Sequence, residues 1–90
     1  MNTEVNIKIQ KLLLNLEVDM PVKTTISDVI MWIYKKHGIW IWVERYSTLF
    51  RPYAEEIGDK RFGKWEGYKF NTLTEAYLAA IEYTLENLIE

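Results

Sequence analysis

The stretch that most constrains the fold of this chain is residues 38–46, Gly-Ile-Trp-Ile-Trp-Val-Glu-Arg-Tyr. Successive side chains of a β-strand point to opposite faces, so a strand here would carry aliphatic side chains on one face, namely Ile39, Ile41 and Val43. The other face would carry three aromatic side chains, Trp40, Trp42 and Tyr46. A strand with one face in water normally alternates apolar with polar side chains. Because neither face of this strand is polar, whatever packs on each face decides the architecture.

A helix is predicted directly before this strand, over residues 25–37. Thr25 can cap its first turn, and Asp28 places a negative charge at the positive end of the helix dipole. Apolar side chains then recur at helical spacing, at Ile26, Val29, Ile30 and Ile33. Basic side chains gather at the C-terminal end, where the dipole favours them, at Lys35, Lys36 and His37. Gly38 follows as the left-handed residue that ends the helix.

A second helix is predicted over residues 72–89. Thr72 and Glu75 have the spacing of a capping box, in which each side chain accepts from an amide of the other residue. A continuous apolar stripe follows, made of Leu73, Ala76, Tyr77, Ala80, Ile81, Thr84, Leu85, Leu88 and Ile89. Acidic side chains occupy the other side, at Glu75, Glu82, Glu86 and Glu90.

Two further strands are predicted between the helices, over residues 49–57 and 64–70, with a loop at residues 58–63. Short connections make successive strands antiparallel neighbours. Pro52 cannot donate to a sheet ladder, so we expect it at an edge or a bulge. The prediction is an α+β two-layer sandwich, in which two amphipathic helices cover one face of a three-stranded antiparallel meander at residues 39–70, in the order α-β-β-β-α.

The N-terminal segment, residues 1–20, fits two structures. Its apolar residues match one face of a short helix over residues 7–16, and they also match a strand with a bulge at Gln10 and Lys11. The run of three leucines after Lys11 favours the helix, because leucine and lysine are good helix formers. Pro21 closes this segment, since the residue before a proline is pushed away from helical geometry.

Length and composition indicate one globular domain over residues 1–90. Hydrophobic residues make up 49% and charged residues 27% of the chain, which is the composition of a folded rather than a disordered protein. The chain has no cysteine, which excludes a disulfide framework, a thiol nucleophile and a cysteine zinc site. The chain does not begin like a signal peptide, and no apolar run approaches the roughly 20 residues needed to cross a bilayer. We therefore expect a cytoplasmic protein that does not bind membranes.

Two segments carry a resemblance. Residues 31–41, Met-Trp-Ile-Tyr-Lys-Lys-His-Gly-Ile-Trp-Ile, are similar to a helix–strand motif Trp-Leu-x-x-x-His-x-Ile, and residues 70–89 are similar to a tail motif Phe-x-(Ser/Thr)-x-x-Glu-Ala-x-x-Ala-Ala-Ile-x-Tyr-x-Leu-Glu-Asn-Leu-Ile. Both motifs resemble those of a family of short uncharacterised proteins from Bacteroides-type gut bacteria, their phages and mobile elements. The resemblance covers residues 25–46 and 68–90. That family has no established function, so the resemblance implies a fold and no activity.

The sequence contains no motif for catalysis, metal binding or phosphate binding. His37 is the only histidine, and its place at a helix C-terminus favours a structural role. The basic loop at residues 59–64 lacks the glycine pattern and helix context of a phosphate-binding loop. We therefore expect a protein that is not an enzyme, with no catalytic residue, no metal and no cofactor.

The aromatic face of Trp40, Trp42 and Tyr46 is the candidate interaction surface. A contiguous apolar patch on a protein surface usually marks a site of association. The leading hypothesis is a small, non-catalytic protein-interaction module that self-associates as a homodimer through this face, or binds an unknown protein. In the alternative, the apolar side chains of residues 5–18 cover the face within the chain.

A nucleic-acid-binding domain is the second hypothesis. The predicted order of helix, three strands and helix is that of double-stranded-RNA-binding domains, and exposed sheet aromatics can stack on bases. The net charge of −2 disfavours this partner, as does the presence of four glutamates and no basic residue in residues 71–90.

Overall fold

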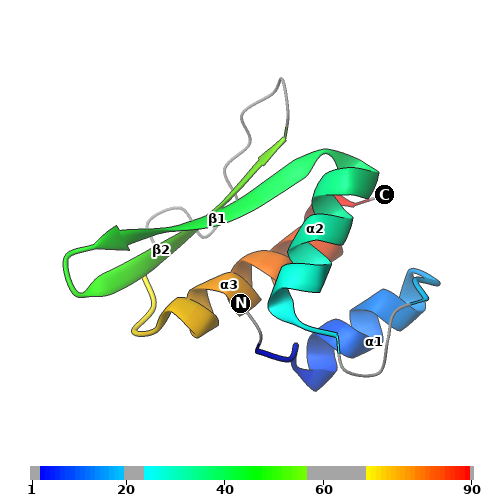
Figure 1. The fold of residues 1–90 in the computed structure, drawn as a ribbon, viewed down its shortest axis with the longest axis horizontal. Coiled ribbons are helices and arrows are strands. Elements are labelled where there is room, and N and C mark those ends of the chain that lie inside the picture. The colour runs from blue at the N-terminus through cyan, green and yellow to red at the C-terminus, as the bar shows by residue number, and fades with distance from the viewer. Residues whose placement is uncertain (1–2, 20–23, 57–68, 90) are drawn as a thin grey trace.

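A two-stranded antiparallel sheet lies on a layer of two helices, with a third helix beyond them (Figure 1). The computed structural model describes residues 3–19, 24–56 and 69–89. The strands are β1 (Ile39–Tyr46) and β2 (Leu49–Glu56), which form a hairpin.

Helices α2 (Ile26–His37) and α3 (Leu73–Tyr83) pack against the same face of the hairpin (Figure 1). Helix α1 (Ile7–Asn15) packs against α3 and against η1 (Thr84–Leu88), a π-helical turn that continues α3, on the side away from the sheet. The predicted placement of two helices on one sheet face is therefore confirmed. Within the part of the chain that the structure describes, no helix is both long and apolar enough to cross a membrane.

The α+β class is confirmed, but the three-stranded meander predicted over residues 39–70 is wrong. The sheet formed by the described residues has two strands. The loop predicted at residues 58–63 lies outside the described residues, and so does most of the strand predicted at residues 64–70. Phe70, at the end of that strand, forms one isolated antiparallel bridge with Phe50, with both N···O distances at 2.8 Å. Side-chain alternation is a local property, whereas a strand also needs a neighbour that pairs along its length, and one bridge pairs a single residue.

The ladder between β1 and β2 is continuous and has no bulge. Phe50 exchanges both backbone hydrogen bonds with Phe70, so the N–H and C=O groups of Phe50 point away from β1. Pro52, two residues further along β2, has the same orientation by the alternation of the ladder. The N–H that Pro52 lacks would therefore point away from β1, and the proline costs no hydrogen bond within the hairpin. Pro52 was predicted to lie at an edge or at a bulge. In the sheet formed by the described residues it lies at an edge.

Both ends of α2 have the predicted chemistry. The Oγ1 atom of Thr25 accepts from the Asp28 N–H at 3.2 Å, and the Asp28 carboxylate accepts from the Thr25 N–H at 3.0 Å, which is a reciprocal capping box. Gly38 ends the helix in the left-handed conformation, with φ at 70°. The chain therefore leaves α2 and enters β1 within one residue.

The helix favoured over residues 7–16 is confirmed. Asn6 caps α1, because its side-chain oxygen accepts from the Ile9 N–H at 2.9 Å. Thr3 accepts from the Ile26 N–H at 2.8 Å, which ties the segment before α1 to the start of α2. The N-terminal segment is thus part of the folded domain.

Helix α1 ends in a Schellman motif that uses a glutamate in place of the usual glycine. Glu17 has a positive φ of 59° and donates its N–H to the Leu14 carbonyl at 2.9 Å. The Val18 N–H donates to the Leu13 carbonyl at 3.0 Å. These are the two hydrogen bonds of that motif, and its left-handed position strongly favours glycine.

The α-helix predicted over residues 72–89 becomes a π-helical turn after Tyr83. Thr84 is completely buried, and its Oγ1 donates to the Ala80 carbonyl at 2.8 Å. A threonine hydroxyl bonded one turn back competes with the backbone ladder and often bends a helix. Wider π-helical turns of this kind form where the α-helical ladder is interrupted.

The start of α3 departs slightly from the predicted capping box. Thr72 accepts from the Glu75 N–H at 3.1 Å, as expected. The Glu75 carboxylate, however, accepts from the Thr72 hydroxyl at 3.1 Å rather than from the backbone N–H of Thr72. Thr72 is the N-cap in either geometry.

One contiguous core connects the sheet with all the helices. Its buried side chains are aliphatic, namely Val5, Ile9, Leu13, Ile26, Val29, Ile30, Ile33, Ile39, Ile41, Ala54, Ala80, Ile81 and Leu85. Ile41, at the centre of β1, is only 2% exposed. The aliphatic face of β1 is therefore the contact with α2 and α3.

Candidate interaction surface

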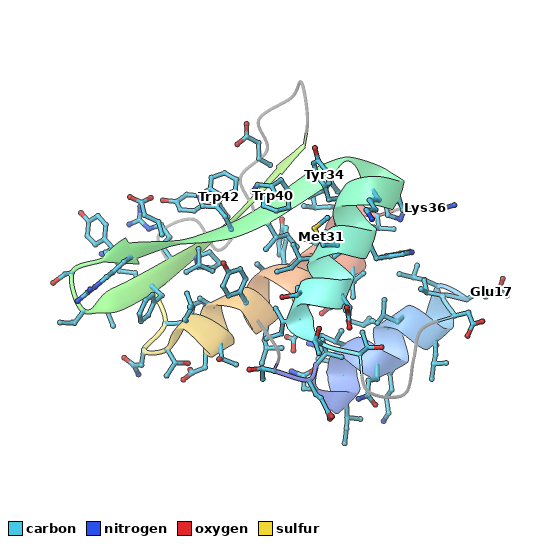
Figure 2. The ribbon with its side chains drawn as sticks, in the orientation of Figure 1. Glu17, Met31, Tyr34, Lys36, Trp40 and Trp42 are labelled. Carbon is cyan, nitrogen blue, oxygen red and sulfur yellow. The ribbon has the colours of Figure 1, made fainter. Side chains whose placement is uncertain are left out.

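The side chains of Trp40 and Trp42 lie on the sheet face opposite the helices (Figure 2). Ile39 and Ile41 face the helices, so the even-numbered side chains of β1 face away from them. Residues directly opposite one another in the hairpin share a face, so the register adds side chains of β2. We call the resulting set the outer face; it comprises Trp40, Trp42, Glu44, Tyr46, Leu49, Arg51, Tyr53 and Glu55.

One end of the outer face is a shallow apolar depression at the junction of β1 and α2. The side chains of Met31, Tyr34 and Trp40 line it, and its volume is about 370 Å³. Their exposed fractions are 40%, 38% and 42%, respectively. The Tyr34 ring stands edge-to-face on Trp40, with centroids 5.2 Å apart and planes at 77° (Figure 2). This contact holds the rings in place while their apolar surface stays open to solvent.

The middle of the outer face is an aromatic pair across the two strands. Trp42 and Tyr53 are directly opposite in the register, and their rings stack with centroids 5.0 Å apart at an angle of 15°. Stacked cross-strand aromatics stabilise a hairpin beyond their area burial. Both side chains are half-buried, so this pair forms a flat and rigid surface between the two ends of the face.

The other end of the outer face is an aromatic ring with two cations. The guanidinium carbon of Arg51 lies 4.8 Å from the centroid of the Tyr46 ring, and the Nζ atom of Lys69 lies 4.0 Å from the same centroid. Both distances are within the range of a cation–π contact. Tyr46 therefore holds two positive charges at the far end of β1 from the depression.

Arg51 is fixed by rings rather than by carboxylates. Its Nη1 donates to the Tyr53 hydroxyl at 3.4 Å, and this hydrogen bond raises the pKa of Arg51 above its already high ordinary value. Its Nε is buried and has no hydrogen-bond partner among the described residues. Glu44 is directly opposite Arg51 in the register but is not close enough for an ion pair. The guanidinium is thus always charged and is not neutralised within the described residues.

All three predicted surface residues, Trp40, Trp42 and Tyr46, lie on the outer face. The alternative in which residues 5–18 cover this face is wrong, because α1 packs on α3 and η1, away from the sheet. The topological argument for a double-stranded-RNA-binding domain also fails, because it needed three strands and the described sheet has two.

Sequence reasoning missed the residues that other segments bring to the face, namely Met31, Tyr34, Arg51, Tyr53 and Lys69. The positions of two of these residues, Arg51 and Tyr53, could have been predicted from the hairpin turn. A two-residue turn at residues 47–48 pairs 46 with 49, which places 42 opposite 53 and 44 opposite 51. Nothing local in the sequence indicates that the exposed side of α2 meets Trp40.

His37, at the C-terminal end of α2, makes a ring contact with Trp32. Its ring lies edge-to-face with Trp32, with centroids 5.1 Å apart at 72°. Within the residues that the structure describes, no three His, Asp or Glu side chains gather in a way that could hold a metal ion. The outer face offers apolar surface, ring faces and two cations, which are groups suited to binding.

No family model, curated protein or solved structure matches this chain. The resemblance to a family of short bacterial and phage proteins therefore stays a prediction.

Proposed function

We propose that this protein is a small, non-catalytic protein-interaction module that binds a partner protein with its outer face. The observation that supports this proposal is the depression lined by Met31, Tyr34 and Trp40, which leaves large apolar side chains exposed beside an ordered aromatic surface. Tryptophan, tyrosine, methionine and arginine are the residues enriched in protein interfaces, and all four types occur on or beside this face.

The exposed apolar surface is large enough to anchor a partner side chain. Trp40 is 42% exposed. On an area of about 250 Å² for a tryptophan, that fraction is about 100 Å², and covering it is worth about 2.5 kcal/mol at ~25 cal/mol per Å². A single residue of this value is a binding hot spot. Tyr34 and Met31 add to it, because an apolar side chain that enters the depression would contact all three.

Selection from a phage-displayed library of random ten-residue peptides tests this proposal. Clones that bind the wild-type protein are counter-screened against Met31→Glu, which places a carboxylate in the depression without removing a core side chain. We expect selected peptides to bind Met31→Glu at least about tenfold more weakly, because an unpaired carboxylate buried in an interface costs about 1–3 kcal/mol. Lys36→Gln is the matched control. It lowers the net charge by the same amount, and Lys36 lies on α2 outside the lining of the depression.

Failure to recover any clone that distinguishes Met31→Glu from Lys36→Gln would refute the proposal. Sedimentation equilibrium across a wide concentration range decides whether the partner is a second copy of the chain. In that case the wild-type protein dimerises and Met31→Glu shifts it toward monomer, with Lys36→Gln unchanged. Circular dichroism of each variant establishes that it is folded.

A further inference from the structure

The two cations at one end of the outer face, Arg51 and Lys69, form no ion pair with the described residues. Ion pairs among the described residues involve only Lys8, which contacts Glu82 at 3.6 Å and Glu86 at 3.2 Å on α3 and η1. Arg51 and Lys69 make no ion pair there, although both are held against Tyr46. Two like charges placed at one ring repel each other, and an added carboxylate would be attracted by both.

The distance between the two ends of the outer face defines the length of a ligand. Trp40 borders the depression and Tyr46 holds the cations, and Tyr46 lies six positions after Trp40 in β1. At about 3.3 Å per residue, that separation is about 20 Å. In an extended peptide that lies along β1, the group that meets the cations must therefore be about six positions along the chain from the side chain in the depression.

We infer that the partner is an extended, acidic peptide segment, with an apolar side chain in the depression at Met31, Tyr34 and Trp40 and a carboxylate about six residues away at Arg51 and Lys69. This inference rests on the proposed function, and it specifies the chemical groups that the partner must carry. The guanidinium of Arg51 can donate two parallel hydrogen bonds to a carboxylate, and Lys69 supplies a second charge.

The face fits a peptide carboxylate better than a nucleic acid. Two of the rings that bases would stack on already have partners, because Trp42 stacks on Tyr53 and cations contact Tyr46. Glu55 lies opposite Trp40 and Glu44 lies opposite Arg51, so a chain of phosphates along β1 would meet negative charge at both of these positions. A peptide whose one acidic group lies at the cation end is far from Glu55, and the charges of Arg51 and Lys69 outnumber that of Glu44 there.

The test uses the peptides selected with the full-length protein. We expect the clones that need Met31 to contain Asp or Glu about six residues from a large apolar residue. Synthetic versions of the tightest clones are then compared with copies in which that acid is changed to Asn or Gln, by fluorescence anisotropy. The amide versions should bind about five- to tenfold more weakly, and the difference should shrink in 1 M salt, where charges are screened within about 3 Å.

Variants of the protein locate the contact. Lys69→Gln and Arg51→Gln should each weaken the acidic peptide and leave its amide version unchanged, whereas Lys36→Gln should weaken neither. Lys69 is exposed, so its variant keeps the test valid if Arg51→Gln disturbs the hairpin. A labelled 12-nucleotide single strand of mixed sequence is measured beside the peptides.

Three outcomes overturn the inference, and they are distinguishable. In the first outcome, selected peptides bind the wild-type protein and not Met31→Glu, but they contain no Asp or Glu and bind Lys69→Gln with unchanged affinity. This would refute the inference that the partner is acidic and leave the proposed function intact. The absence of any clone that needs Met31 would refute the proposed function and the inference with it. An oligonucleotide that binds more tightly than every peptide, and loses binding with Lys69→Gln, would assign the two cations to phosphate.

Discussion

Glu17 at the end of α1 offers a test of how the backbone ends this helix. The residue is exposed and has a φ of 59°, and the hydrogen bonds of Glu17 and Val18 to the last turn keep it there. A side chain in this conformation crowds the following carbonyl, which costs about 1–2 kcal/mol. Glycine removes that cost but loses about 0.5–1 kcal/mol because its unfolded backbone is freer. We therefore expect Glu17→Gly to raise the free energy of unfolding by about 0.5–1 kcal/mol.

Urea and thermal unfolding followed by circular dichroism measure this effect. For a domain of this size the gain corresponds to a rise in Tm of about 2–8 °C. Glu17→Ala is the control for the charge, because it removes the carboxylate and keeps the Cβ atom, and it should give no such gain. Asn15→Gly is the control for glycine itself. Asn15 is the last residue of α1, so glycine there should lower the stability, by up to about 0.5 kcal/mol because asparagine is itself a poor helix former.

Equal stabilities of Glu17→Gly and Glu17→Ala would refute this reasoning, since the Cβ atom would then carry no strain. A loss in Glu17→Gly as large as that in Asn15→Gly would mean that residue 17 is not left-handed in solution. Either result would also put the packing of α1 against α3 in question, because the motif at Glu17 determines where α1 stops.

Two further predictions concern the hairpin and the capping box. Ser47 has a φ of 60° at the first position of the turn at residues 47–48, where glycine is favoured, so Ser47→Gly should raise the free energy of unfolding by up to about 1 kcal/mol in urea titrations. Thr48→Gly, one residue later, should not stabilise. The Thr25 N–H lowers the pKa of Asp28. Ionised Asp28 thus adds stability that is present above its ordinary pKa of 3.8 and is lost as the pH falls through the lower folded value. The stability difference between wild type and Asp28→Asn should therefore vanish in acid; a constant difference from pH 7 to pH 2 would contradict this.

The sequence was sufficient where a few neighbouring residues decide the structure. Thr25 and Asp28 start α2 and Gly38 ends it, and each effect acts within one turn of the helix. The alternation in residues 38–46 likewise placed Ile41 and Trp40 on opposite faces of the strand, because the strand period is set by the backbone alone. The helices and the two faces of β1 could be predicted for this reason.

The sequence was insufficient where the fold depends on which segments of the chain pair or pack with one another. The alternation before Phe70 resembled a third strand, yet within the described residues Phe70 pairs with Phe50 at a single bridge. The apolar side chains of α1 could have covered Trp40 and Trp42, and they pack on α3 instead. The pairing of the segment before Phe70 and the packing of α1 both depend on which surfaces are buried against each other. The periodicity of a segment does not indicate which other segment it packs against.

Residues 38–46 illustrate both what the sequence determines and what only the tertiary structure determines. Its own residues determined that a strand forms there and that one of its sides is aromatic and the other aliphatic. Only the tertiary structure decided that this side stays free of α1, meets Met31 and Tyr34 at one end, and carries two cations at the other. Those neighbours come from other elements, because a strand specifies its own two faces whereas the fold specifies what lies beside them.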